Sequence, residues 1–144
     1  MIEFINVSKS YGKKQALKDL SLSIRQGEIF GFLGHNVAGK STTIKSLVSI
    51  IEPSSGTILV DGMKLTENRL SIKQKIGYVP DSPDIFLQLT AGEYWDLISA
   101  AYELDTQKKE KRLAELTALF DMYSHQNETI ASFSHGMRQK TILI

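Results

Sequence analysis

The first half of the chain carries short segments whose apolar pattern predicts β-strands. Residues 2–7 are β-prone, and in residues 20–24 leucine and isoleucine alternate with serine, as in a half-buried strand. Residues 28–33, Glu-Ile-Phe-Gly-Phe-Leu, form a nearly continuous apolar run, which predicts a strand covered on both faces. Two further strands are predicted at residues 57–60 and 75–79. The first half is therefore expected to be rich in strands.

Helical spacing interrupts this pattern once and then dominates the second half. A helix is predicted over residues 40–51, with one apolar face formed by Ile44, Leu47, Val48 and Ile51.

In the second half, three polar residues mark the starts of helices. Thr90 and Glu93 have the spacing of a capping box and predict a helix that reaches about Tyr102. Asp105 predicts the N-cap of a second helix that reaches Met122. After an expected loop over residues 124–133, Ser134 predicts the N-cap of a last helix.

Composition narrows the class of protein. The chain has 144 residues, 42% of them hydrophobic and 23% charged, which suits one ordinary globular domain with a real core. A formal net charge of +1 gives no bulk argument for binding nucleic acid or a membrane surface. The absence of cysteine, of a signal peptide and of any apolar run of about 18 residues favours a cytoplasmic protein.

The stretch from Gly34 to Ser41 matches the phosphate-loop pattern G-x-x-x-x-G-K-[ST]. Its glycines let backbone N–H groups turn toward an anion, and the helix that follows offers its positive N-terminal end to the same phosphates. Lys40 is expected to reach the β- and γ-phosphates, and the Ser41 hydroxyl to bind Mg²⁺. The alternative is a glycine-rich turn, which the predicted strand before and helix after make the weaker interpretation.

Val37 stands at a position where such a loop commonly relies on glycine. A β-branched residue held at positive φ costs about 1–3 kcal/mol, which corresponds to a roughly tenfold to hundredfold loss of affinity if it falls on the bound state. We therefore predict an impaired phosphate loop, which binds ATP more weakly than the Val37→Gly variant. Equal affinities in a titration of both proteins would contradict this.

Together these motifs resemble the ATP-binding subunit of ABC transporters, in particular of drug and bacteriocin exporters. The resemblance covers essentially the whole chain and rests on Tyr11, the phosphate loop, residues 76–81 and the signature-like stretch 132–140. It implies an α/β fold, a P-loop NTPase core with an antiparallel β subdomain and an inserted helical subdomain, incomplete at the C-terminus.

The resemblance also implies three parts of the chain. Residues 1–84 would form the nucleotide-binding core with its antiparallel β subdomain. Residues 85–133 would form the helical subdomain, and residues 134–144 the start of the signature helix.

The resemblance assigns roles to residues outside the phosphate loop. Tyr11 would stack on adenine, although it could instead be a turn residue that half-covers the core. Ser134 and Gly136, in a signature in which His135 and Met137 depart from the common Leu-Ser-Gly-Gly-Gln, would bind the γ-phosphate held by another subunit. Without the phosphate loop this stretch would be only a helix cap. The implied nucleotide-binding residues are Tyr11, Gly34, His35, Asn36, Val37, Ala38, Gly39, Lys40, Ser41, Thr42, Ser134 and Gly136.

Asp81 follows Tyr-Val-Pro, where the family usually has a glutamine that contacts Mg²⁺ and the attacking water. Aspartate can also bind Mg²⁺, so Ser41 and Asp81 are the expected metal ligands; a simple Asp-Ser-Pro turn is the alternative. The aromatic-rich stretch from Pro83 to Trp95 either receives helices of a membrane partner or forms the core of the helical subdomain.

The elements that the family places after the signature, an apolar strand ending in Asp-Glu and a later switch histidine, do not follow within residues 1–144. We therefore expect no catalytic residue in this chain, no ATP turnover by it alone, and self-association that covers exposed apolar surface.

For the parent protein we expect export driven by ATP and Mg²⁺, with a transmembrane permease subunit and a head-to-tail second ATP-binding subunit as partners. It would lie on the cytoplasmic face of the cell membrane and would bind no nucleic acid. The alternatives are a soluble ABC ATPase that acts on ribosomes or DNA, and a nucleotide-binding fragment that does not hydrolyse ATP.

Overall fold

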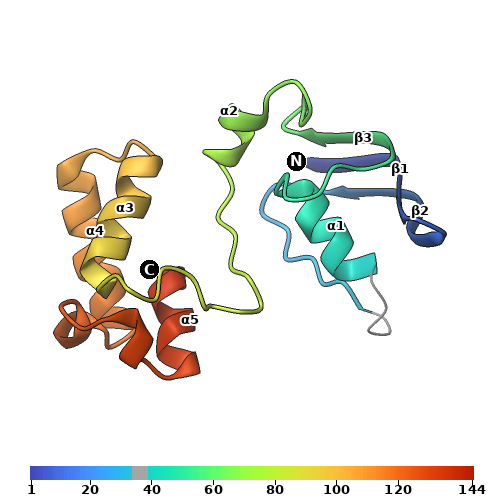
Figure 1. The fold of residues 1–144 in the computed structure, drawn as a ribbon. Coiled ribbons are helices and arrows are strands. Elements are labelled where there is room, and N and C mark those ends of the chain that lie inside the picture. The colour runs from blue at the N-terminus through green and yellow to red at the C-terminus, as the bar shows by residue number, and fades with distance from the viewer. Residues whose placement is uncertain (34–38) are drawn as a thin grey trace. The chain divides into compact units, whose positions relative to one another are not determined.

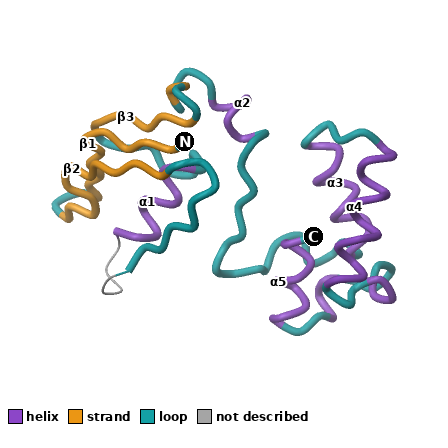
Figure 2. Tube along the Cα trace, turned by 180° about the vertical axis from the view of Figure 1, so that it is seen from behind, coloured by secondary structure: helices purple, strands orange, loops and turns teal. Residues whose placement is uncertain are grey.

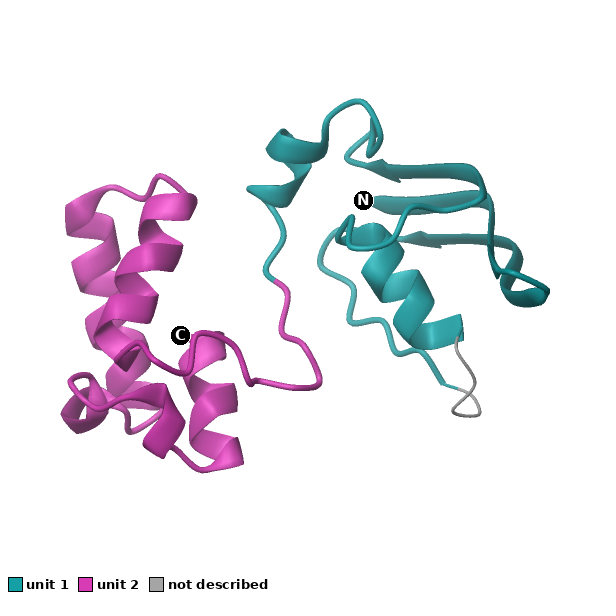
Figure 3. Cartoon of the chain, in the orientation of Figure 1, with its two compact units in different colours: residues 1–77 teal, residues 78–144 magenta. Residues whose placement is uncertain are grey.

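The computed structural model describes residues 1–33 and 39–144 of the chain. Within them the chain forms two compact units, Met1–Gly77 and Tyr78–Ile144 (Figure 3). The division falls before the expected boundary at residue 84, and the signature helix belongs to the second unit. None of the helices in the described residues is both long enough and apolar enough to cross a membrane.

The first unit is built on a four-stranded antiparallel sheet with the strand order β2-β1-β3-β4 (Figures 1 and 2). The strands are β1 (Ile2–Tyr11), β2 (Lys14–Ile24), β3 (Ser55–Val60) and β4 (Met63–Lys64). The strands predicted at 2–7, 20–24 and 57–60 are thereby confirmed. Asp61 and Gly62 both have positive φ, 50° and 76°, as a two-residue hairpin turn requires.

The core of the first unit lies on one face of this sheet. Phe4 pairs with Ile58 on one side and with Leu22 on the other, and Phe4, Val7 and Ile58 are almost fully buried. Gly56 has a φ of +88°, and a Cβ there would lie 2.4 Å from the Asn6 carbonyl oxygen. Only glycine therefore allows β3 to approach β1 this closely.

Helix α1 (Gly39–Leu47) is shorter than the predicted 40–51, and of the predicted apolar face Leu47 packs against the core but is not fully buried. Thr42, Thr43 and Ser46 are the buried residues, whereas Ile44 is 39% exposed. The Thr43 hydroxyl donates to the Gly39 carbonyl at 2.8 Å, so its polar atom is satisfied within the helix. Small side chains whose hydroxyls can bond inside the helix let α1 pack closely, which an apolar-face prediction cannot anticipate.

At the C-terminal end of α1, N–H groups of the residues that follow donate back to the last turn of the helix. The N–H groups of Ile50 and Ile51 both donate to the Lys45 carbonyl, and Ser49 adopts a φ of +58°. These bonds satisfy the Lys45 carbonyl, one of the acceptors that a helix end leaves open, and the chain then leaves the helix before Pro53.

Two predicted strands are absent, and these predictions were wrong. Residues 28–33 and 75–79 have no strand structure among the described residues. Ile29 is fully exposed and Leu33 is 96% exposed. A strand exists only through hydrogen bonds to a neighbouring strand, and none of the described segments pairs with either stretch. An apolar pattern indicates that a segment favours burial, but it does not show which neighbouring strands would pair with it.

The second unit is helical, with α3 (Ala91–Ala101), α4 (Thr106–Leu119) and α5 (His135–Leu143). All three predicted N-caps are confirmed: the side chains of Thr90, Asp105 and Ser134 accept backbone N–H bonds, and Thr90 completes a capping box with Glu93. The expected loop over 124–133 contains parts of two short 3-10 turns, Tyr123–His125 and Ile130–Ser132. Helix α2 (Arg69–Lys73), in the first unit, has five residues, too few for a periodic signal.

The aromatic-rich stretch belongs mostly to the core of the second unit. Pro83, Tyr94 and Trp95 are buried, and the Trp95 indole N–H donates to the Thr141 carbonyl at 2.9 Å. This bond pins α5 against α3. Phe86 is the exception, because it is 51% exposed and has a φ of +50°. Of the two interpretations left open by the sequence, the structure favours the core for most of these side chains.

Candidate functional site: a phosphate-binding helix end and a signature helix

The described part of the phosphate loop is the first turn of α1, which begins at Gly39. Lys40 is half-buried and Ser41 is exposed in this turn, whereas Thr42 is 5% exposed and lies on the buried face. The first N–H groups of a helix have no partner inside the helix and sit at its positive end, which favours an anion. Thr42 belongs to the same turn, but because it is buried its side chain faces the core. The predicted contacts of Gly34, His35, Asn36, Val37 and Ala38 lie outside the described residues.

Tyr11 lies at the end of β1, where the tight turn through Gly12 leads into β2. Its side chain is 46% exposed, and the Lys9 ammonium lies 5.4 Å from its ring centroid. Gly39 lies against the Ala16 carbonyl of β2, close in sequence to Lys14, which pairs with Tyr11. The exposed ring and the first turn of α1 therefore lie toward the same end of the sheet.

The two expected metal ligands lie in different units, Ser41 in the first and Asp81 in the second. Both are exposed, and Asp81 occupies a bend just after Pro80. Hydroxyl and carboxylate oxygens are ligands that Mg²⁺ accepts, so each of the two side chains has donor chemistry that suits this ion. Among residues 1–33 and 39–144, no group of three or more histidine, aspartate and glutamate side chains is arranged to hold a metal.

The signature-like stretch forms the N-terminus of α5. The Ser134 side chain accepts the Met137 N–H at 3.3 Å as an N-cap, while its own hydroxyl hydrogen can still be donated. Ser134, His135 and Gly136 are exposed, and among the described residues nothing outside the local helix backbone lies within 4 Å of the position that a Cβ on Gly136 would occupy. The open approach over Gly136 leaves the first amides of the helix accessible to an anion.

Arg138, to which the sequence alone assigned no role, forms a hydrogen-bond network beside the start of α5. The Arg138 guanidinium donates to Asp84 Oδ1 at 2.6 Å and to the Ile130 and Ala131 carbonyls at 3.2 and 2.8 Å. Asp84 also accepts the Ser82 hydroxyl at 3.1 Å. The hydrogen bond from Arg138, followed by that from Ser82, lowers the pKa of Asp84. The helix dipole disfavours a cation in the first turn of a helix. Arg138 at this place in the predicted helix was therefore the sequence signal that acceptors lie near it.

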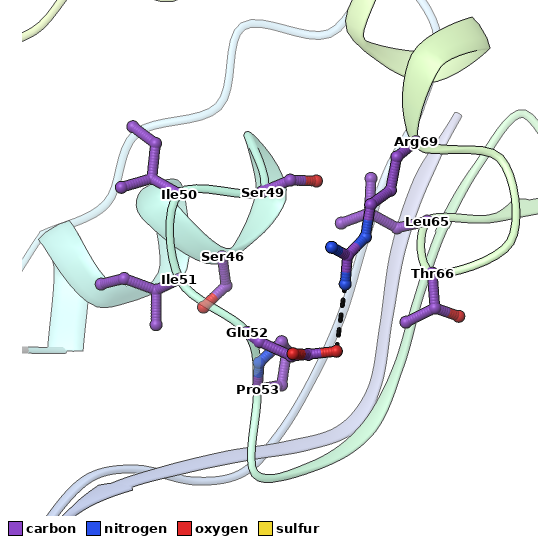
Figure 4. A pocket seen from close by; sticks show the side chains of 9 residues that line it. All are labelled: Ser46, Ser49, Ile50, Ile51, Glu52, Pro53, Leu65, Thr66 and Arg69. Atoms are coloured by element: carbon purple, nitrogen blue, oxygen red, sulfur yellow. Dashed lines mark hydrogen bonds and ion pairs between the residues drawn. The ribbon is translucent and has the colours of Figure 1, made fainter.

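A polar pocket of about 210 Å³ lies at the other end of α1, between this helix and α2 (Figure 4). The Arg69 guanidinium and the Glu52 carboxylate form an ion pair of 3.0 Å at its wall. The hydroxyl oxygens of Ser46 and Ser49 are buried there with no hydrogen-bond partner in the part of the chain that the structure describes. This pocket is remote from the N-terminal turn of α1 and does not belong to the phosphate site.

Comparison with known proteins places the chain in a family. The family described as "ABC transporter" matches residues 17–144. The linearmycin resistance ATP-binding protein of Bacillus subtilis is 36% identical over 97% of this chain.

A solved ATP-binding subunit of an ABC transporter superposes with a TM-score of 0.93 over 99% of the chain, at 31% identity. A dimeric post-hydrolysis state of the ATP-binding cassette MJ0796 bound to ADP and Pi gives a TM-score of 0.85, also over 99% of the chain, at 26% identity.

The chain spans 45% of the length of the linearmycin resistance protein, 60% of the solved ATP-binding subunit and 67% of the MJ0796 cassette. It is thus similar, over nearly its whole length, to part of each. The match covers both the antiparallel sheet with α1 and the helical unit with the signature-like stretch. The chain therefore belongs to the ABC transporter family.

Proposed function

We propose that this chain binds ATP as part of a subunit that drives export through a separate membrane subunit. One observation carries the proposal: the sequence pattern that ends in Gly39-Lys40-Ser41 runs directly into the first turn of α1, where Ser41 is exposed, toward the end of the sheet that carries Tyr11. Backbone amides of this turn and the Lys40 ammonium would bind the phosphates, and the Tyr11 ring would stack on adenine.

Mg²⁺, when bound, neutralises charge on the β- and γ-phosphates. The Ser41 hydroxyl would hold it, and we propose Asp81 as a second ligand. Aspartate in place of the usual glutamine adds a negative charge beside the ion, so its binding should depend more strongly on pH and ionic strength.

The proposed partners are a second ATP-binding subunit and a transmembrane permease. In a head-to-tail pair, Ser134 and the amides of His135 and Gly136 would bind the γ-phosphate on the other subunit, the kind of stabilisation on which phosphoryl transfer depends. Both the name of the linearmycin resistance relative and the dimeric solved cassette support this proposal. The subunit would then work on the cytoplasmic face of the membrane. The relatives give no support to action on ribosomes or DNA.

The first test is ATP affinity, measured by titration with a fluorescent ATP analogue. Lys40→Ala should weaken binding by roughly tenfold to a hundredfold, because it removes a charge-assisted contact with phosphate. Lys45→Ala, in the last turn of the same helix, is the matched control and should bind like the wild type. Equal affinities for all three proteins would refute the proposal.

The second test asks whether ATP turnover is coupled to the membrane partner. ATP turnover is measured for residues 1–144 and for the full-length subunit with its membrane partner. We expect turnover only in the second case, and resistance to an exported compound should then require Lys40.

A further inference from the structure

The N-terminal turn of α5 contains a positive charge where helix electrostatics disfavour one. Arg138 is the fourth residue of α5, and its backbone N–H donates to the Ser134 carbonyl at 3.0 Å. The helix dipole makes this end positive, so a cation here is disfavoured and hydrogen bonds to strong acceptors offset that cost. Its side chain is 23% exposed and donates hydrogen bonds to Asp84 and to the Ile130 and Ala131 carbonyls.

Two of these acceptors belong to the segment that delivers the chain into α5. The Ile130 and Ala131 carbonyls lie in the 3-10 turn that ends two residues before Ser134. Because the planar guanidinium donates to two consecutive carbonyls, it restrains both the position and the direction of this turn. The Ser134 cap and the free amides that follow are restrained with it.

The third acceptor lies in a different part of the second unit. Asp84 is three residues beyond Asp81 and also holds the Ser82 hydroxyl. The ion pair therefore joins the segment that contains Asp81 to the turn that positions Ser134. Within the second unit these two functional segments, far apart in sequence, share one side-chain network.

We propose that Arg138 and Asp84 form a positioning pair that aims the Ser134 hydroxyl and the first amides of α5 at the γ-phosphate held by a second copy of the chain. This inference rests on the proposed function. The guanidinium acts through the backbone it holds rather than on the nucleotide: each of its three nitrogens donates one hydrogen bond, to Asp84 or to one of the two carbonyls. Through the same ion pair, the orientation of the first turn of α5 depends on the conformation of residues 81–84.

Three single variants of the full-length protein, and the double variant Arg138→Lys with Asp84→Asn, test the pair. Arg138→Lys keeps the charge but lacks the planar donor geometry, and Asp84→Asn keeps the size but loses the ion pair. Arg112→Gln removes an exposed arginine–glutamate pair on α4 and is the matched control. Each protein is assayed for ATP affinity, for ATP-dependent dimer formation and turnover, and, without nucleotide, for hydrogen exchange at the amides of residues 134–137.

We expect Arg138→Lys and Asp84→Asn to bind ATP within about twofold of the wild type, because the phosphate loop lies in the first unit. Dimer formation and turnover should fall about tenfold in each, and exchange at residues 134–137 should be faster. The double variant should be no worse than Arg138→Lys alone, since both changes disrupt one network. Arg112→Gln should match the wild type in every assay.

The results separate this inference from the proposed function. If the wild type neither binds ATP nor dimerises, the proposed function fails, and the exchange measurement still decides whether the pair orders the start of α5. If the wild type is active and Arg138→Lys is equally active, Arg138 supplies at most a charge, and the positioning role is refuted. Unchanged exchange at residues 134–137 in both variants would overturn it as well.

Discussion

Small hydroxyl side chains decide how α1 packs. Thr42, Thr43 and Ser46 form its buried face, and Thr43 satisfies its hydroxyl inside the helix. Ser46 differs, because its hydroxyl is fully buried with no partner among the described residues. A buried hydroxyl without a partner has lost its hydrogen bonds to water and received none in return, which costs stability.

Replacing Ser46 with alanine should therefore raise the free energy of unfolding by about 1 kcal/mol, since it removes the unsatisfied group and improves helix propensity. Urea unfolding of the full-length protein measures this. Ser99→Ala is the control, because the Ser99 hydroxyl donates to the Trp95 carbonyl at 2.6 Å and its loss should destabilise. Destabilisation by Ser46→Ala would mean that the hydroxyl is bonded in solution, through water in the adjoining pocket.

Asp84 links the charge network to pH. Its pKa is lowered, first by the hydrogen bond from Arg138 and then by that from Ser82, with a smaller contribution from His135 on α5. A carboxyl group whose pKa is lower in the folded state stabilises the fold above its ordinary value of 3.8. That stabilisation is lost as the pH falls through the lowered pKa.

The wild type should consequently lose more stability than Asp84→Asn on acidification from about pH 5 to below the pKa of Asp84. Urea midpoints at a series of pH values measure the difference. Asp61, whose pKa is also lowered, is present in both proteins and cancels in the comparison. Parallel curves for the two proteins would show that Asp84 titrates no differently in the folded chain.

Among the elements, helix starts follow from local sequence, whereas a strand also needs a partner strand. Thr90 accepts the Glu93 N–H at 3.2 Å, and the Glu93 carboxylate accepts the Thr90 N–H at 2.8 Å. These bonds join residues three positions apart, so the pattern of residue types is enough to predict them. Residues 28–33 need strands from elsewhere in the fold, and no local pattern contains that information.

The capping box of α3 predicts the effect of Thr90→Ala. Loss of the side-chain acceptor leaves an N–H of the first turn without its partner and should cost about 1 kcal/mol of stability, measured by denaturant unfolding. Thr106→Ala, an exposed site in the first turn of α4, is the control and should have little effect. Equal effects of the two substitutions would mean that the capping box contributes nothing specific to α3.

For the whole molecule, the main feature of the described residues is uncovered apolar surface. Ile29, Phe30 and Leu33 are 101%, 42% and 96% exposed and follow one another in one segment. Contiguous exposed apolar groups and unpaired backbone favour association with other chains. Residues 1–144 on their own are therefore expected to self-associate.

Light scattering on residues 1–144 tests this expectation. The wild-type segment should form dimers or larger species, and Ile29→Lys with Leu33→Lys should reduce them, because charge prevents burial of the segment. Leu70→Lys, at an exposed leucine on the short helix α2, is the control and should leave association unchanged. A monodisperse wild-type monomer would contradict the expectation.

What the sequence by itself determined is local or motif-based. The phosphate-loop pattern, the three helix caps and the alternating strands depend on residues close together in the chain, so they could be predicted from spacing alone. The position of Tyr11 near the first turn of α1, the buried hydroxyl face of that helix and the pairing of Asp84 with Arg138 were decided only by tertiary structure. Each joins segments that are distant in sequence, and which distant segments meet depends on the packing of the whole fold.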